Sequence, residues 1–353
     1  MRVGILGAGA VGTRVAQHLQ GADGVDAIIL RDIRPGVEAA ALAQLGGGVE
    51  SDGRRIGIPD VDLLVLASPA GQHVRSATKA VERGVHVVSV SDNIEDVQGL
   101  LRLDSHSERT GATVLAGAGF SPGLTGVLAR HAATRLQRVD EIHVAKMGTG
   151  GPACARQHHR ALKSQSLDWR DGIWVRRPGG SGRELVWFPA PIDAHDCYRA
   201  ELPDTILLVP HFPGVQRVTA RVSATRRDRL TMHLPMLRRP HPEGLEGAVR
   251  VEVRGQTTSG GVGSVIVGAV APPAVGAAAT AATAAELIIN RTLKAGAMGL
   301  SHLDSAAGFL YAMQLKGIDT EIFEGLAELS AVDLDESGSV VDLRENLQKN
   351  LLP

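Results

Sequence analysis

The sequence of 353 residues contains only two cysteines, Cys154 and Cys197, and they form no Cys-x-x-Cys pair. So few cysteines exclude a disulfide scaffold, and their spacing argues against an iron–sulfur cluster or a zinc–thiolate site. A cysteine-poor chain suits a reducing compartment. We therefore expect a cytoplasmic protein without a bound metal.

Aromatic residues are also scarce, at 3% of the chain, and neither charge predominates, because 37 lysines and arginines balance 38 aspartates and glutamates. Without a basic excess the chain has no broad attraction for nucleic acid or anionic lipid. The uncharged stretch 262–285 is rich in Ala, Gly and Thr and contains Pro272 and Pro273, whereas a spanning helix needs about 20 strongly apolar residues. We expect neither nucleic acid nor a membrane as a partner.

The first 136 residues do contain a regular alternation of apolar runs with segments long enough for helices. The runs have no polar residue at every second position, which is typical of strands buried on both faces of a parallel sheet. The pattern predicts an α/β fold in which residues 1–136 form a doubly wound Rossmann domain. The expected strands are 2–8, 27–32, 62–69, 86–91 and 113–119, and the expected helices are 11–20, 35–45, 72–83, 95–110 and 123–136.

The pattern changes in residues 137–274. In the segment 249–254 three valines alternate with charged residues, which predicts a strand with one buried and one exposed face. We expect an antiparallel α+β domain that binds the substrate and offers an exposed sheet face for a homodimer. Further helices are expected at 275–295, 303–316 and 319–329, followed by a loosely attached tail at 331–353.

A glycine-rich turn, Gly7-Ala8-Gly9-Ala10-Val11-Gly12, follows the first expected strand and opens the first expected helix. The first glycine permits a tight turn, the second permits close approach of a pyrophosphate, and the third permits close packing of the helix. Free N–H groups at the start of the helix would then hold the phosphates. The residues expected to bind a dinucleotide here are Gly7, Gly9, Ala10, Val11 and Gly12.

Asp32 lies at the end of the second expected strand, where an acidic residue accepts hydrogen bonds from the adenosine ribose. A carboxylate at this place repels a 2′-phosphate, so the sequence favours NAD over NADP. Arg31 and Arg34 flank Asp32, and either could pair with a phosphate if Asp32 turned away. We therefore expect NAD, with Arg34 beside it, and keep NADP as an alternative.

Two more strand ends carry polar residues. Ser68 and Pro69 end the third expected strand, and Ser91 and Asp92 end the fourth. Ligands bind at the carboxyl ends of strands in open α/β sheets, so all four residues are candidates for the pocket. Asp92 could instead cap the expected helix 95–110.

The segment Gly119-Phe120-Ser121-Pro122-Gly123 matches the Gly-x-Ser-x-Gly pattern of a hydrolase nucleophile. An oxyanion hole at such a turn needs the backbone N–H of the residue after the serine, and Pro122 has none. This argues against a hydrolase. We expect Ser121 to cap helix 123–136 and Pro122 to lie in its first turn.

The combination of GAGAVG, VVSVSD and GAGFSPGLTGVLA resembles the saccharopine dehydrogenase-like oxidoreductases, such as saccharopine reductases and carboxynorspermidine dehydrogenases. The resemblance covers most of the chain. It implies that helices in 275–330 return to complete the Rossmann domain. It also implies hydride transfer between nicotinamide and a carbon that bears nitrogen, in an amino-acid-derived substrate. Ser121 stands where that family usually has Asp, and Asp92 where it usually has an aromatic residue, which points to a different substrate.

Hydride transfer at a C–N bond needs a group that exchanges the proton on nitrogen. The candidate catalytic residues are Asp92, Lys146 and His159, and the candidate substrate-binding residues are Ser121, His195, Tyr198 and Arg199. Residues 195–199 concentrate polar groups in an expected loop, where binding residues are common. Cys154 and His158 are four residues apart on an expected helix, but no third ligand accompanies them, so we expect no metal site.

Other functions stay open. The segment 67–88 resembles sugar dehydrogenases, but that family continues with Glu-Lys-Pro, where this chain has Ser89-Val90-Ser91-Asp92. An aspartate-dehydrogenase-like enzyme is a further alternative. A non-catalytic sensor of NAD(H) belongs to another class, and consumption of NADH would distinguish it from an enzyme.

Overall fold

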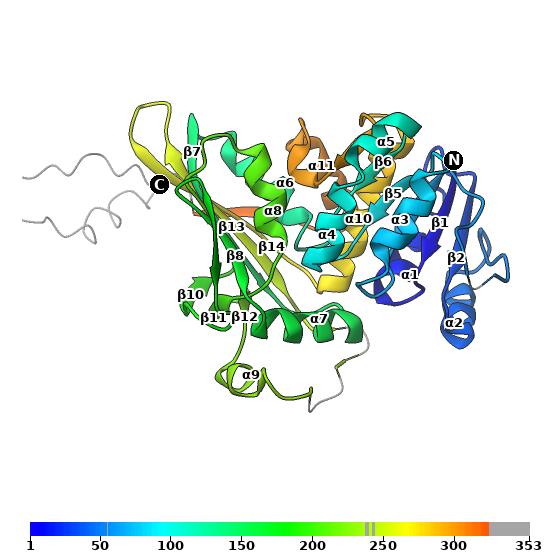
Figure 1. The fold of residues 1–353 in the computed structure, drawn as a ribbon, viewed down its shortest axis with the longest axis horizontal. Coiled ribbons are helices and arrows are strands. Elements are labelled where there is room, and N and C mark those ends of the chain that lie inside the picture. Colours follow the sequence, from blue (N-terminus) through cyan, green and yellow to red (C-terminus); the bar gives the residue numbers. More distant parts are fainter. Residues whose placement is uncertain (55, 237–239, 242–243, 325–353) are drawn as a thin grey trace, which may run out of the picture.

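The computed structural model describes residues 1–54, 56–236, 240–241 and 244–324, and they form two sheets that lie beside each other (Figure 1). The first sheet has seven strands in the order β15-β6-β5-β4-β1-β2-β3, and all its pairs are parallel. Its strands are β1 Arg2–Leu6, β2 Ala27–Arg31, β3 Val49–Glu50, β4 Leu63–Leu66, β5 His86–Ser89, β6 Thr113–Leu115 and β15 Gly296–Met298.

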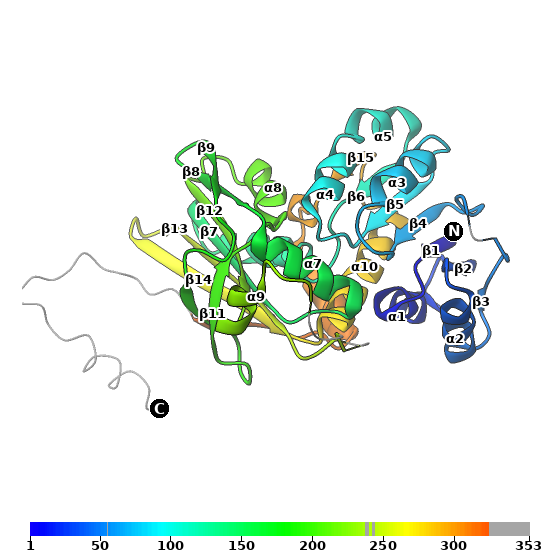
Figure 2. The same ribbon diagram turned by 60° about the horizontal axis from the view of Figure 1, so that its bottom comes forward.

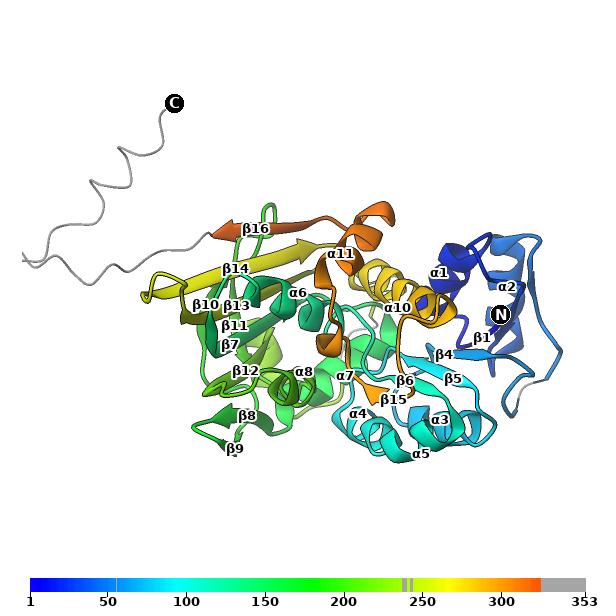
Figure 3. The same ribbon diagram turned by 90° about the horizontal axis from the view of Figure 1, so that it is seen from above.

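Helices cover both faces of this sheet, as Figure 3 shows, with α1, α2 and α10 on one side and α3, α4 and α5 on the other. Two separate apolar clusters lie beneath them, because every central strand is buried on both faces. The predicted doubly wound Rossmann fold is thus confirmed. The helices are α1 Ala10–Leu19, α2 Pro35–Leu45, α3 His73–Val81, α4 Ile94–Leu101, α5 Asp104–Thr110 and α10 Pro273–Ile289.

The second sheet has the order β10-β11-β12-β7-β13-β14-β16, with β8 and β9 as an attached hairpin. It is antiparallel as expected, except that β7 and β12 run parallel. Its strands are β7 Arg138–Met147, β8 Ser166–Arg170, β9 Ile173–Arg177, β10 Glu184–Trp187, β11 Ala194–Arg199, β12 Arg217–Ser223, β13 Ala248–Gln256, β14 Val262–Val270 and β16 Thr320–Glu324.

The remaining helices lie around this sheet and at its junction with the first. Figure 2 shows α7 reaching from the second sheet toward α1 and α10. No helix in the described ranges combines the length and the apolar character that crossing a bilayer requires. These helices are α6 Leu124–Ala133, α7 Pro152–Lys163, α8 Asp204–Leu208, α9 Arg226–Thr231 and α11 Ala306–Leu315, with short 3₁₀ turns at Val209–His211 and Leu300–His302.

The chain passes between the two sheets more than once. After β14 it returns to the first sheet, where α10 packs against α1 and β15 pairs with β6. It then leaves again, because residues 320–324 pair with β14 as the edge strand β16. The expectation of a helix at 319–329 was therefore wrong for residues 320–324. Residues 325–329 and the expected tail 331–353 lie outside the described part of the chain.

Three further expectations need correction. The expected helix 95–110 is two helices, α4 and α5, which are separated at residues 102–103. Helix α6 begins at Leu124 after Gly123, so Ser121 does not cap it. Residues 195–199 belong to strand β11 and not to a loop. Two of their polar side chains form ion pairs with other segments, Asp196 with Arg183 and Arg199 with Asp168, so the sequence pattern does not show the strand.

Candidate active site at the junction of the two domains

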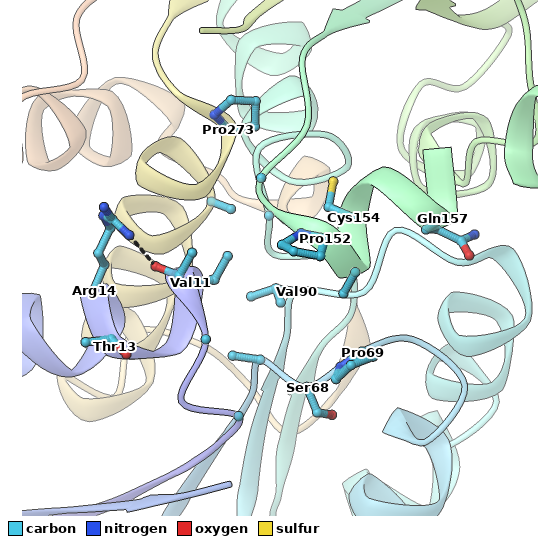
Figure 4. A pocket seen from close by; sticks show the side chains of 18 of the residues that line it. Val11, Thr13, Arg14, Ser68, Pro69, Val90, Pro152, Cys154, Gln157 and Pro273 are labelled. Carbon is cyan, nitrogen blue, oxygen red and sulfur yellow. Dashed lines mark hydrogen bonds between the residues drawn. The ribbon is translucent and has the colours of Figure 1, made fainter. Parts of the chain in front are cut away.

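A cavity of about 710 Å³ lies where the carboxyl ends of the first sheet meet α7 and the end of β7 (Figure 4). Such a volume is typical of small-molecule and cofactor sites. It is lined by both domains, so neither domain forms it alone. Among its lining residues are Gly7, Gly9, Ala10, Val11, Asp32, Arg34, Ser68, Pro69, Ser91, Asp92, Ser121, Lys146, Cys154, Arg156 and Gln157.

The glycine-rich turn has the geometry that a dinucleotide requires. Gly7 has φ +109°, a conformation that favours glycine, and its N–H donates to the carbonyl of Arg31 (2.8 Å). A Cβ on Gly12 would overlap the carbonyl oxygen of Gly7, whereas a Cβ on Gly9 would meet no atom within 4 Å. No side chain caps α1 at Gly9, and Gly9, Ala10 and Val11 line the cavity, so the free N–H groups of the first turn can hold an anion there.

Asp32 is buried at the rim of the same cavity and accepts four hydrogen bonds. The N–H of Ala8 donates to Oδ2 (3.0 Å), while Arg34 donates from its backbone and from Nε to Oδ1 (2.9 Å each) and from Nη2 to Oδ2 (3.0 Å). Burial alone would raise the pKa of Asp32, but these hydrogen bonds outweigh it and hold the pKa below its ordinary value. Asp32 is therefore held as an anion, and Arg34 is its exposed partner.

Arg31 and Arg34 are not equivalent. Arg31 is buried, and its guanidinium donates to Asp52 and to the carbonyl of Gly57. It points away from the cavity and is not available to a phosphate. The side chain of Arg34 is 60% exposed, so of the two expected arginines only Arg34 can reach a ligand.

Buried polar groups tie the loops after β4 and β5 to each other. Nε2 of His73 donates to the carbonyl of Ser68 (2.9 Å), and its Nδ1 faces the hydroxyl of Ser89 (2.8 Å). Burial lowers the pKa of His73, which keeps the imidazole neutral in this arrangement. The carboxylate of Asp96 accepts from Gly71 N–H (2.7 Å) and from the Ser91 hydroxyl (2.8 Å). Both loops are thus fixed where they line the cavity.

Asp92 and Lys146 meet at the far end of the cavity. Nζ of Lys146 lies 3.4 Å from Oδ2 of Asp92 and donates to the carbonyl of Ser121 (3.3 Å). Burial opposes the charge of Lys146, but the neighbouring Asp92, Cys154 and Asp204 outweigh it and raise the pKa of the lysine. Asp92 does not cap the next helix, because Asn93 caps α4 through the N–H of Asp96.

A residue that the sequence did not indicate lies behind this pair. Asp204 is 1% exposed and accepts from the hydroxyls of Ser121 (3.1 Å) and Thr125 (2.6 Å). Burial raises the pKa of Asp204, while these hydrogen bonds and Lys146 oppose that rise. Asp204 fixes the segment around Ser121, whose carbonyl contacts Lys146. No motif around residue 204 marks this role, since only the tertiary structure brings α8 to α6.

Several expected residues are not brought to the cavity. Nε2 of His159 donates to the carbonyl of Leu234, and Nε2 of His195 donates to the carbonyl of Ile192. Tyr198 is buried under Arg229, and Arg199 is paired with Asp168. Instead, α7 contributes Cys154, Arg156 and Gln157 to the cavity. The sequence indicated Cys154 only as a residue of an expected helix, and it did not indicate Arg156 or Gln157. No group of three metal-binding side chains occurs in the part of the chain that the structure describes.

Gly9 and Gly12 of the turn give a test that separates an effect on folding from an effect on binding. We expect Gly12→Ala to lower the free energy of unfolding by about 1–3 kcal/mol, because its methyl group overlaps backbone. Gly9→Ala should change stability by less than about 1 kcal/mol. It should still weaken NADH binding at least about tenfold, since the methyl group fills the space of the phosphates. Thermal unfolding and fluorescence titration measure both, and unaltered NADH binding by Gly9→Ala would contradict this use of the turn.

Comparison with known proteins agrees with this geometry. Residues 1–110 match the oxidoreductase family with an NAD-binding Rossmann fold. Apo saccharopine dehydrogenase (L-Glu forming) from Saccharomyces cerevisiae has a TM-score of 0.67 at 13% identity and covers 92% of this chain and 100% of its own. A putative myo-inositol dehydrogenase from Sinorhizobium meliloti has a TM-score of 0.45 at 13% identity, with 90% of this chain and 95% of its own covered. An amine dehydrogenase from Mycobacterium smegmatis has a TM-score of 0.43 at 14% identity, with coverages of 87% and 96%.

The predicted resemblance is thereby confirmed for the fold, and the match over residues 1–110 confirms NAD as the cofactor type. Residues 1–110 thus match an oxidoreductase family with an NAD-binding Rossmann fold, and the chain as a whole has a fold similar to that of yeast saccharopine dehydrogenase.

Proposed function

We propose that the protein transfers a hydride between NAD(H) and the C–N bond of an amino-acid-derived substrate, by reduction of an imine or oxidation of an amine. The observation that carries this proposal is the ion pair of Asp92 and Lys146 at one end of a cavity whose other end has the glycine turn and Asp32. This arrangement offers proton exchange beside the place for the reactive end of a dinucleotide.

The residues of the cavity fit NAD. The open space beside Gly9 and the free N–H groups of α1 suit a pyrophosphate, and the carboxylate of Asp32 suits ribose hydroxyls. Ser68, Pro69 and Ser91 would contact the nicotinamide end, because they lie on the loops after β4 and β5. NAD, when bound, supplies or takes the hydride.

We propose that Asp92 exchanges the proton on the substrate nitrogen. An ammonium substrate must lose one proton before its lone pair can form the C=N bond, and a carboxylate can take that proton. In the reverse direction hydride addition to the protonated imine gives a neutral amine, and the protonated Asp92 returns its proton to that nitrogen. Lys146 holds Asp92 in place through its positive charge. Because the pKa of Lys146 is raised, its ammonium group stays charged at pH values up to and beyond the usual pKa of lysine, about 10.4.

Action at a C–N bond is preferred to action at a sugar hydroxyl. Sugar dehydrogenases that resemble residues 67–88 continue with Glu-Lys-Pro, whereas here Ser91 and Asp92 follow β5, and the lysine comes from β7 of the second domain. The name of the yeast structure with the same fold, saccharopine dehydrogenase, supports a C–N substrate. Saccharopine reductases usually have Asp at the position of Ser121, and this difference supports a substrate other than saccharopine.

The proposal is tested by NADH consumption with a panel of 2-oxo acids combined with ammonium or amino acids, and by NAD reduction with the corresponding amines. We expect turnover with at least one member. Asp92→Asn should lower kcat roughly 100- to 10,000-fold and leave NADH binding within about threefold, because it removes proton exchange only. Lys146→Met should also lower kcat. NADH binding without turnover of any amine would favour a sensor, and turnover of sugars alone would contradict the C–N assignment.

Coenzyme preference is tested with a matched pair of variants. Asp32→Ala should weaken NADH binding about 10- to 100-fold, because hydrogen bonds to a charged group are lost. The difference in affinity between NADH and NADPH should therefore become smaller. Arg34→Ala frees the carboxylate, so it should preserve NADH binding and weaken NADPH binding. Fluorescence titration with both coenzymes measures this, and an unchanged preference in Asp32→Ala would reject the role of Asp32.

We also propose that the protein forms a homodimer through the second domain. The edge strand β10 carries Leu185 and Trp187, which are 58% and 57% exposed. Large exposed apolar side chains on a sheet edge favour association. Light scattering should give twice the mass of one chain, and Trp187→Lys should shift the equilibrium toward the monomer. A monomer at micromolar concentration would contradict the proposal.

A further inference from the structure

Asp204 is a buried carboxylate to which no cation is bonded. It is the first residue of α8 and is 1% exposed, and it accepts hydrogen bonds from the hydroxyls of Ser121 (3.1 Å) and Thr125 (2.6 Å). No lysine or arginine in the described ranges forms an ion pair with it. A buried charge without a direct partner is costly, so its presence needs an explanation.

The two hydroxyls do not by themselves explain an acid at this place. They need only an acceptor, and an amide would offer one without the desolvation of a charge. Both oxygens of Asp204 face donors, because Oγ of Ser121 lies 3.1 Å from Oδ1 and 3.2 Å from Oδ2. Donors around a carboxyl group favour its ionised form and oppose the effect of burial. The surroundings of Asp204 therefore suit an anion.

Ser121 connects Asp204 to the pair of Asp92 and Lys146. Its hydroxyl donates to Asp204, and its carbonyl accepts from Nζ of Lys146 (3.3 Å). The same Nζ lies 3.4 Å from Oδ2 of Asp92. Two carboxylates therefore act on the charge of Lys146: Asp92, which lines the cavity, and Asp204, which does not.

These two carboxylates are the counter-charges of Lys146 at neutral pH. The titratable groups of the described residues that act on its ammonium, or on which it acts, are Asp92 after β5, Cys154 and His158 on α7, and Asp204 on α8. Burial raises the pKa of Cys154 to about 11 and lowers the pKa of His158 to about 4, so both side chains are neutral. Asp92 and Asp204 are left to balance the buried ammonium.

Proton transfer removes one of these counter-charges. When Asp92 takes the proton from the substrate nitrogen, its carboxylate becomes a neutral acid and no longer balances Lys146. A buried charge that loses its partner is strongly destabilised. Asp204 is then the counter-charge that remains.

We propose that Asp204 is a positioning residue for the proton transfer, whose carboxylate balances the ammonium of Lys146 while Asp92 carries the proton. The inference rests on the proposed function, in which Asp92 exchanges the proton on nitrogen. That proton leaves the substrate nitrogen and is bound by the carboxylate of Asp92. Lys146 and Asp204 keep their own protonation states throughout.

The charge of Lys146 can be measured without turnover. The sequence has only six lysines, so the full-length protein labelled with ¹³C at the lysine ε carbons gives few NMR signals, and Lys146→Met identifies the signal of Lys146. Asp92→Asn imitates the protonated form of Asp92. We expect Lys146 to stay charged in this variant at about pH 8, because Asp204 remains. A neutral Lys146 would overturn the proposal, and this measurement needs no change at Asp204.

Asp204→Asn removes the charge and keeps an acceptor oxygen. It should lower the pKa of Lys146 by about one unit or more, because one of two opposite charges is lost. The matched control is Thr125→Val, which removes the shortest hydrogen bond to Asp204 and keeps every charge. It should leave that pKa within about half a unit. An unaltered titration in Asp204→Asn, as a neutral Asp204 would give, or an equal shift in Thr125→Val overturns the proposal.

Kinetics then link this charge to the reaction. With a substrate from the panel, Asp204→Asn should lower kcat about 10- to 100-fold and leave NADH binding within about threefold, because Asp204 does not line the cavity. The alkaline limb of the pH profile of kcat should move to lower pH together with the pKa of Lys146. An unchanged kcat overturns the role in proton transfer. Absence of turnover by the wild-type protein would overturn the proposed function instead, whereas NMR decides separately whether Asp204 balances Lys146.

Discussion

The contact between Lys146 of the second domain and Asp92 of the first joins the two domains where both of them line the cavity. A buried ammonium is stable only with compensating groups around it, and here they come from separate elements: Asp92 after β5, the carbonyl of Ser121 before α6, and Asp204 on α8. The side chain of Lys146 reaches them because it lies on the same face of β7 as Ile142 and Val144, which pack in the core. A shift of β7 by one residue would turn the lysine to the opposite face.

The first domain could be predicted from the sequence almost element by element. The five strands that were expected are apolar runs because both faces are covered, and the glycine turn has a fixed spacing to Asp32. The short edge strands β3 and β15 were not predicted. Ser68, Pro69, Ser91 and Asp92 were found because ends of parallel strands meet at one edge of the sheet. These residues all line the cavity.

The second domain was predicted less well, since its elements depend on contacts that no local pattern records. Strand β11 looked like a polar loop because Asp196 and Arg199 find their ion-pair partners on other segments, Arg183 and Asp168. Arg156 and Gln157 resemble ordinary residues of an amphipathic helix until α7 is seen at the junction. Asp204 carries no motif, and its role follows only from the hydroxyls of Ser121 and Thr125.

The course of the chain between the sheets has a consequence for biosynthesis. The coenzyme-binding sheet begins with β1 near the N-terminus but lacks its edge strand β15 and the covering helix α10 until residues 273–298 have been made. During translation the ribosome must therefore deliver the chain as far as residue 298 before this sheet is complete. Strand β16 then closes the other sheet last of all the described elements. The two domains thus mature together rather than in succession, and neither can be cut out of the gene as one uninterrupted piece.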